Sequence, residues 1–310
     1  MMMQSHLNIH PEVAQALATG RPVVALESTI IAHGMPHPEN LETARALDQI
    51  IRSQGAIPAI IAVAEGKIQV GCDNDLLGRL ATEEDVLKVS RRDMGMALAG
   101  GELGATTVSG TLIGAHLAGI RVFVTGGIGG VHRGVWETWD ISADIPELAQ
   151  SQVAVVSAGA KSILDLPKTL EALETAGVPV IGWGTDEFPA FFTPHSGISL
   201  VHSTRDPSRI ARAMHAQWDL GLPGGFLIAN PISSAWAANA DDIEQATQDG
   251  IEAARRSGIS GKAMTPFLLD FIQKQTAGES LAANRALVKG NAEVGAAIAR
   301  AFTGMVQGEL

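Results

Sequence analysis

The sequence predicts an α/β protein with a mixed, largely parallel central sheet, helices on both faces (α/β/α) and a helical C-terminal layer. Short apolar runs alternate with longer segments of helical periodicity, which is the pattern of strand–helix units in parallel sheets. Hydrophobic residues make up 46% of the 310 residues, enough to bury a large core. No repeat, low-complexity tract or linker divides the chain, so we expect a single domain over residues 1–310.

The apolar runs predict the strands of this sheet. They fall at residues 22–26, 56–63, 67–70, 86–89, 106–108, 122–125, 153–157, 178–182 and 226–228. Glu65 and Gly66 lie between the second and third runs and are typical of a hairpin turn. The strand after that turn should therefore run antiparallel to the one before it, which makes the sheet mixed.

The periodic segments predict the helices. They cover residues 11–19, 38–54, 75–80, 109–118, 162–176, 207–220, 241–257, 266–275 and 281–302. In 38–54, for example, Leu41, Ala44 and Leu47 recur on one face, and Gly55 ends the helix. From about Trp236 onward the pattern is entirely helical, which predicts the C-terminal layer.

Composition excludes several functions. The net charge of −11 argues against a nucleic acid polymer as partner, because such binding needs clustered Lys and Arg. Cys72 is the only cysteine, so no internal disulfide can form, and a reducing cytoplasmic setting fits. The N-terminus has no signal-peptide pattern, and no run of about 18 uncharged apolar residues predicts a membrane span.

Ligands of open α/β sheets bind beyond the carboxyl ends of the strands, so polar residues at those positions are the first candidates. Glu27 directly follows the first predicted strand. Partial burial there would favour the neutral acid and suit it to proton donation, although capping of a helix start is an equally good explanation.

The segment 88–93 carries Lys88, Arg91 and Arg92, and three cations so close together can hold a phosphate or sulfate. On pattern alone, a solvated surface run with Asp93 as ion-pair partner is favoured slightly over such a site.

The segment 125–134 has five glycines within nine residues, and His132 and Arg133 lie among them. Glycines let the backbone approach a ligand and present N–H groups to an anion. The segment lacks the Lys-Ser/Thr pair of a P-loop and is too glycine-rich for the usual dinucleotide fingerprint. We interpret it as a ligand loop rather than a plain turn.

Lys161 stands among small residues after the strand at 153–157, just before the helix expected at 162. A lysine in a dry pocket or near another cation becomes neutral more easily and can form a Schiff base. The alternative is a solvent-exposed lysine, but the positive end of a helix dipole is a mildly unfavourable place for a cation. That misfit favours a functional lysine slightly.

Asp140 and Asp144 are spaced so that both carboxylates can share one face of a turn and bind a hard cation. Surface acidity with Ser142 in a cap is the plain alternative. No zinc or EF-hand motif is present, so any metal should be Mg²⁺ or Mn²⁺ in type, with few protein ligands and several waters.

Together these segments resemble the pseudouridine-5'-phosphate glycosidases, the indigoidine synthase A-like family. The matching strings run in family order across nearly the whole chain: VVALESTIIAHGMP (23–36), KVSRRD (88–93), GATTV (104–108), VTGGIGGVHRG (124–134), DISAD (140–144), SAGAKSILDLP (157–167), PAFF (189–192), ANPI (229–232) and TPFLL (265–269). Residues 183–188 and 193–206 look less family-like than the blocks around them.

The resemblance implies reversible conversion of pseudouridine 5'-phosphate and water to uracil and ribose 5-phosphate, by an enzyme counted among the carbon–oxygen lyases. It also implies a homotrimer and one Mn²⁺ per subunit. By similarity, Lys161 attacks ribose C1' and forms a ring-opened imine, Glu27 donates a proton, and Asp140 binds the metal. The residues that it assigns to substrate binding are Lys88, Val108, Ser142, Ala143, Asp144, His132, Gly127, Gly130 and Asn284.

Two other hypotheses remain open from the sequence. The glycine-rich loop and the 140–144 acid pair could serve ATP and Mg²⁺ in a carbohydrate kinase. Alternatively, the chain could be a catalytically silent nucleotide-binding protein on the same fold. Retention of Lys161, Glu27 and Asp140 together argues against the silent protein.

Overall fold

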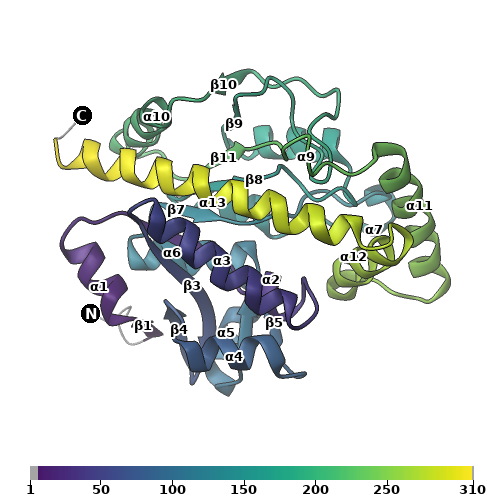
Figure 1. The fold of residues 1–310 in the computed structure, drawn as a ribbon, viewed down its shortest axis with the longest axis horizontal. Coiled ribbons are helices and arrows are strands. Elements are labelled where there is room, and N and C mark those ends of the chain that lie inside the picture. The colour runs from purple at the N-terminus through teal and green to yellow at the C-terminus, as the bar shows by residue number, and fades with distance from the viewer. Residues whose placement is uncertain (1–5, 309–310) are drawn as a thin grey trace.

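The computed structural model describes residues 6–308. Eleven strands form one sheet, in which the path β1-β4-β3-β2-β7-β8-β11-β9-β10 is joined by β6, paired with β3, and β5, paired with β6 (Figure 1). Their bounds are β1 (Leu7–Ile9), β2 (Val23–Leu26), β3 (Ile57–Ala64), β4 (Lys67–Val70), β5 (Leu87–Val89), β6 (Gly104–Thr106), β7 (Val122–Val124), β8 (Ala154–Ser157), β9 (Val180–Trp183), β10 (His202–Thr204) and β11 (Phe226–Ala229). Strand β3 pairs antiparallel with β4 and β6, and the other pairs are parallel. The predicted mixed sheet and its hairpin are confirmed.

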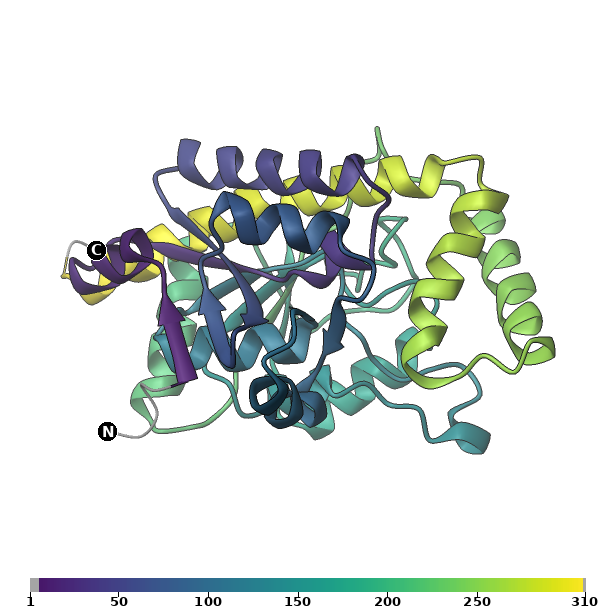
Figure 2. The same cartoon turned by 90° about the horizontal axis from the view of Figure 1, so that it is seen from below.

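Helices cover both faces of this sheet. The helices are α1 (Pro11–Ala18), α2 (Thr29–Ala32), α3 (Glu39–Ser53), α4 (Asn74–Thr82), α5 (Arg91–Gly100), α6 (Val108–Ala118), α7 (Val135–Thr138), α8 (Asp144–Leu148), α9 (Leu166–Thr175), α10 (Pro207–Asp219), α11 (Ala240–Arg256), α12 (Met264–Gln275) and α13 (Glu279–Val306), with a 3₁₀ turn at Gly261–Ala263. Helices α11 and α12 pack on each other and stand out at one end of the molecule (Figure 2). We call residues 240–275 the helical arm.

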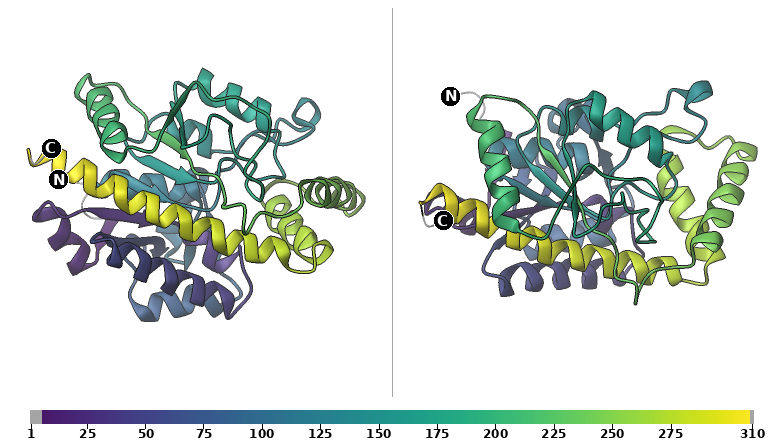
Figure 3. Two further views of the ribbon diagram at one scale, coloured as in Figure 1. Left: turned by 45° about the horizontal axis from the view of Figure 1, so that its top comes forward. Right: turned by 90° about the horizontal axis from the view of Figure 1, so that it is seen from above.

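Helix α13 is the longest element and crosses the middle of the sheet, flanked by α3 and α10 (Figure 3). Gly295 lets it approach β7 closely, because a Cβ at this position would lie 2.2 Å from a methyl carbon of Val124. Another helix, α6, makes a similar approach to the sheet at Gly114, where an added Cβ would lie 2.7 Å from Ile61. Small residues therefore set how tightly these two helices cover the sheet.

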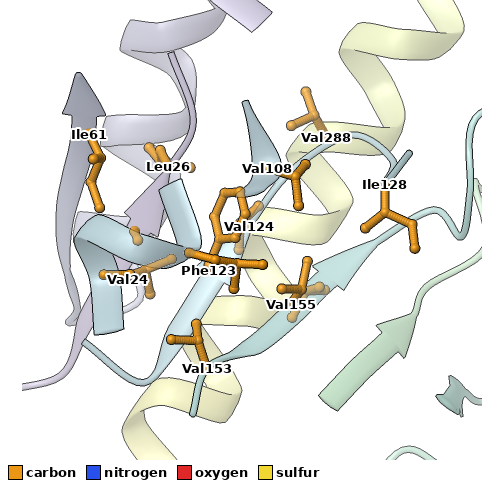
Figure 4. Packing of buried hydrophobic residues seen from close by; sticks show 14 of the residues in the cluster. Val24, Leu26, Ile61, Val108, Phe123, Val124, Ile128, Val153, Val155 and Val288 are labelled. Carbon is orange, nitrogen blue, oxygen red and sulfur yellow. The ribbon is translucent and has the colours of Figure 1, made fainter. Parts of the chain in front are cut away.

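The core is aliphatic, as the scarcity of aromatic residues requires. Strands β2, β7 and β8 are buried along their whole length. Val124 of β7 faces α13, whereas its neighbour Phe123 and the register partner of Phe123, Val155, point to the opposite face, so both sides of these strands are packed (Figure 4). Each fully buried Val, Leu, Ile or Phe contributes about 1.5–3 kcal/mol relative to exposure. These strands therefore give the polar residues at their ends a rigid base.

A buried hydroxyl network brings the end of β6 level with the end of β2. The carbonyl oxygen of Ile61 accepts hydrogen bonds from Ser28 Oγ (2.7 Å) and Thr106 Oγ1 (2.6 Å), and Thr106 N donates to Ser28 Oγ (2.8 Å). Although β6 runs opposite to β2, this arrangement places the first turn of α6 beside Glu27 at one edge of the sheet.

Two predicted boundaries are wrong near the polar loops. Val108 begins α6 instead of ending a strand, because Thr107 caps the helix by accepting a hydrogen bond from Gly110 N. The helix expected at 162 begins at Leu166, after the cap Asp165. The intervening residues instead bond to the glycine-rich loop, for example through Asp165 N to the Val131 carbonyl (2.9 Å). Strands β1 and β10 and helices α2, α5, α7 and α8 were not predicted.

No helix within the described part of the chain combines the length and apolar character needed to cross a membrane. The predicted absence of a membrane-spanning helix is thus consistent with residues 6–308.

We predict that Gly295→Ala lowers the free energy of unfolding by about 1–3 kcal/mol, because the added methyl group must push α13 away from β7. The matched control is Gly290→Ala on the same helix, where the nearest atom to an added Cβ is 3.6 Å away. That change should be neutral or stabilise by up to about 1 kcal/mol through helix propensity. Urea unfolding measures both, and equal effects would contradict the packing argument.

Candidate active site

A cavity of about 550 Å³ opens where the ends of β2, β5, β6, β7 and β8 meet the helical arm. Its lining contains all but one of the residues that the family resemblance assigns to catalysis, substrate and metal: Glu27, Lys88, Val108, Gly127, His132, Asp140, Ser142, Ala143, Asp144, Lys161 and Asn284. The rule that ligand residues follow strand ends therefore identified one continuous site. A cavity of this size suits a small molecule.

Gly130 is the exception. It does not line the cavity, and a Cβ added to it would lie 2.4 Å from the Thr169 side chain. Its carbonyl oxygen accepts a hydrogen bond from Ser142 N (2.9 Å). Gly130 thus lets the loop pack on α9 and supports the cavity from behind.

Asp144 joins two walls of the cavity. Its carboxylate accepts hydrogen bonds from Ser109 N (2.9 Å), in the first turn of α6, and from Gly129 N (2.7 Å), in the glycine-rich loop. A Cβ on Gly129 would lie 2.8 Å from the Asp144 carboxylate, so the glycine permits this contact. The residue is 5% exposed, and both oxygens are thus occupied by backbone donors.

The glycine-rich loop also packs against an aromatic ring that was not predicted to take part in the site. A Cβ on Gly127 would lie 2.6 Å from Phe191, which lines the cavity and is 2% exposed. Phe191 has a left-handed φ of 65°, which costs free energy in a non-glycine residue. Its backbone N–H donates to the Ala158 carbonyl (3.1 Å), which ties it to the loop that carries Lys161.

Glu27 lies at the end of β2, buried, and faces the cavity. Its carboxyl group accepts hydrogen bonds from the hydroxyl groups of Thr29 and Thr125, one on each carboxyl oxygen. The two threonines fix the orientation of the group. They follow β2 and β7 directly, a position that could have marked them in the sequence.

Lys161 and Lys88 bring two amines into one cavity. Within residues 6–308 the Lys161 ammonium group has no hydrogen bond or ion pair with protein, whereas Lys88 donates only to the Lys262 carbonyl oxygen, at 3.4 Å. Burial, followed by repulsion from Lys161, lowers the pKa of Lys88 to about 8. An anion bound between these amines would relieve that repulsion.

The helix-dipole argument for Lys161 is wrong, because no helix begins at residue 162.

The arginines that the sequence placed near the predicted phosphate site do not all reach the cavity. Arg92 lines the cavity, but Arg91 pairs with the buried Glu147 (2.5 Å) and Arg133 pairs with Glu244 of α11 (2.6 Å). The Arg133 side chain therefore anchors the helical arm and is not among the cavity-lining residues.

The arm itself contributes a cation that the sequence did not single out. Lys262 lines the cavity and pairs with Asp93 at 2.5 Å. Asp93 also accepts hydrogen bonds from the backbone N–H and hydroxyl of Ser90 and so caps α5. No motif signals this contact, since the partners lie far apart in sequence.

Among the described residues of the cavity, Asp140 and His132 lie close enough together to contact one divalent cation. Their Oδ2 and Nδ1 atoms are 4.0 Å apart. Burial lowers the pKa of His132, an effect that Asp140 opposes and Lys161 and Lys88 reinforce, so the neutral imidazole is favoured. Residues 6–308 contain no group of three or more His, Cys, Asp or Glu side chains that could hold a metal. The donor set therefore fits a hard ion that keeps most of its waters and rules out a protein cage built from those residues.

The fold and the cavity define an α/β protein with a small-molecule cavity, lined by several cations, at the carboxyl edge of its sheet. A family model of indigoidine synthase A like proteins matches residues 12–301. A relative from Caldanaerobacter subterraneus subsp. tengcongensis, named pseudouridine-5'-phosphate glycosidase, is 57% identical over 297 residues, which cover 96% of this chain and 97% of the relative. A protein of the same name from Cupriavidus pinatubonensis is 54% identical over 307 residues, covering 99% and 98%.

Two solved structures are similar over nearly their whole length. The prealnumycin C-glycosynthase AlnA, in complex with ribulose 5-phosphate, has a TM-score of 0.90 and 41% identity, covering 98% of this chain and 99% of that one. An indigoidine synthase A-like protein from Thermotoga maritima has a TM-score of 0.87 and 34% identity, covering 96% and 97%. The chain belongs to the indigoidine synthase A-like family, and the resemblance inferred from its motifs is confirmed.

We predict that the affinity for ribose 5-phosphate falls as the pH rises above about 8, because Lys88 then loses the charge that attracts the phosphate. The phosphate group of ribose 5-phosphate is already fully ionised above pH 8, so its own charge does not change over this range. The loss should be about fivefold between about pH 8 and 9, because the charged fraction of Lys88 falls from about one half to about one tenth. Lys88→Arg stays charged and should bind evenly over this range. Isothermal titration measures both, and parallel curves would contradict the role of Lys88.

Proposed function

We propose that this protein catalyses the reversible cleavage of the C–C glycosidic bond of pseudouridine 5'-phosphate to uracil and ribose 5-phosphate. The observation that carries the proposal is the position of Lys161, an amine without a protein partner among the described residues, in a cavity that also holds Lys88 and the buried carboxyl group of Glu27. The names of the relatives support this reaction. The name of AlnA, a C-glycosynthase, and its ribulose 5-phosphate support C-glycosidic chemistry on a phosphorylated pentose.

The base is bound through carbon, so protonating a leaving nitrogen cannot cleave the bond, and the electrons that expel the base must come from a nucleophile joined to C1'. In the proposed sequence, the Lys161 amine attacks C1', the bond from C1' to the ring oxygen breaks, and Glu27 delivers a proton to that oxygen. The nitrogen lone pair then expels the base, which takes up a proton at C5 and leaves as uracil. Water hydrolyses the remaining imine, which releases ribose 5-phosphate and the free amine.

The substrate's phosphate is proposed to lie among Lys88, the first turn of α6 at Val108, and His132, with Gly127, Ser142 and Ala143 close by. Lys88 supplies charge, and the backbone N–H groups of a helix start and a glycine-rich loop supply donors. Asp144 takes part through the backbone groups that it orients. Asn284 lines the same cavity and is proposed to contact the base.

A divalent cation, Mn²⁺ or Mg²⁺, is proposed at Asp140, with His132 beside it. A hydrated ion there would supply water molecules that orient the base. A homotrimer in the cytoplasm stays a prediction from the resemblance, and the mass in solution by light scattering tests the trimer.

The names of the relatives also favour this activity over the carbohydrate kinase and the silent nucleotide-binding protein. ATP-dependent phosphorylation of a sugar, or tight binding of pseudouridine 5'-phosphate without turnover, would support those alternatives instead.

The proposed adduct can be trapped. Borohydride reduction in the presence of ribose 5-phosphate should attach the pentose to Lys161, and peptide mass spectrometry locates it. Lys161→Ala should lose at least about 10³-fold in kcat with its folding unchanged. Lys168→Ala is the matched control, since Lys168 pairs with Asp165 and does not line the cavity. A label elsewhere, or none, would overturn the imine mechanism.

The metal site is tested by binding as well as by activity. Asp140→Asn should weaken Mn²⁺ binding, measured by electron paramagnetic resonance, by about tenfold or more, because a neutral amide is a poorer ligand for a hard cation. Chelation should lower turnover in the unsubstituted protein, and added Mn²⁺ should restore it. Full activity after thorough metal removal would refute the proposed role of Asp140.

A further inference from the structure

A second cavity of about 300 Å³ adjoins the first. It lies between the turn after α2, helix α12 and the start of α13, and Phe192 completes its wall. Five residues line both cavities: His33, Gly34, Pro266, Leu269 and Asn284. The two spaces therefore meet at one junction, and the site has a side branch in addition to its main opening.

The two openings differ in charge. The main cavity is lined by Lys88, Arg92, Lys161 and Lys262, of which Arg92 and Lys262 are exposed at its rim. Among the described residues that line the second cavity there is no Lys or Arg, and the exposed rim residues are Pro36 and Asp270. A phosphate dianion is attracted to the first opening, whereas the described lining of the second offers it no cation and its one exposed carboxylate, Asp270, is paired with Lys274 (2.6 Å).

The junction has buried polar atoms that no protein group satisfies within residues 6–308. Asn284 is 8% exposed, and its Oδ1 atom is buried without a hydrogen bond. The Nε2 atom of His33 is likewise buried without a hydrogen bond. Burial, and then the charge of Lys88, lower the pKa of His33 and favour its neutral ring. An unsatisfied buried polar atom costs about 1–3 kcal/mol, so a ligand that bonds to these atoms at the junction would be stabilised there.

We infer that the second cavity is the passage and waiting site of the uncharged base, so that a planar imide heterocycle, uracil, enters and leaves between α12 and the turn after α2. This inference rests on the proposed function. While the pentose is attached to Lys161 with its phosphate near Lys88 as proposed above, the sugar obstructs the main opening. The side branch gives the uncharged base a route whose described lining holds no Lys or Arg. At the junction, Asn284 Oδ1 and His33 Nε2 can accept hydrogen bonds from the N–H groups of the base.

Narrowing the passage should lower the rate at which uracil reaches the site and leave access of ribose 5-phosphate unchanged. Gln273 lines the second cavity only, is half-buried and has no side-chain hydrogen bond within the described residues. In the synthetic direction, Gln273→Trp should lower kcat/KM for uracil by about fivefold or more, with kcat/KM for ribose 5-phosphate within about twofold of its original value. Leu281→Trp, from the other wall, should act in the same direction. Gln275→Trp, exposed on the same helix and outside both cavities, should change neither.

Each outcome decides the matter. A loss of kcat/KM for uracil alone in Gln273→Trp and Leu281→Trp, with unchanged thermal unfolding, supports the passage. An unchanged kcat/KM for uracil, or an equal loss for both substrates, overturns it while leaving the proposed function intact. Absence of turnover in the unsubstituted protein would overturn the proposed function and, with it, the assignment of the passage to a released base.

Discussion

The buried carboxylate of Asp144 is the contact on which the shape of the site depends. It takes one backbone N–H from the first turn of α6 and one from the glycine-rich loop, two segments that come from different parts of the sheet. Hydrogen bonds from two fixed donors offset the cost of burying a charge. The positions of Val108 and Gly127 relative to each other, and hence the form of the anion-binding wall, follow from this one side chain.

A second constraint is the gathering of positive charge in a protein of net charge −11. Lys88 and Lys161 repel each other in the cavity, and the nearby carboxyl groups of Glu27 and Asp144 offset this repulsion and the cost of burying Lys88 only in part, so that the pKa of Lys88 stays lowered. The folded protein thus keeps an unbalanced pair of amines. That imbalance costs stability in the free protein and favours binding of a phosphorylated ligand.

Much of the fold could be predicted, because its strands are long enough to appear as apolar runs with clear stops. The predictions failed where local hydrogen bonds override periodicity. Thr107 caps α6 within a β-branched run, and residues after Lys161 pair with the glycine-rich loop instead of beginning a helix. For the site, the strand-end rule found Glu27, Lys88 and Lys161. Phe191 and Lys262 escaped it, because a left-handed backbone and a contact across the helical arm are products of tertiary structure.

Helix α13 has a consequence for how the chain matures during synthesis. It covers β2, β7 and β8, the buried centre of the sheet, and it is the last element along the chain. Until residues 279–306 have left the ribosome, those apolar strands have no cover on that face, and Asn284 is missing from the cavity. From the time that β8 (Ala154–Ser157) emerges until α13 follows, a nascent chain of this protein therefore exposes this apolar face of its sheet, and the sheet and the site become complete at the same moment.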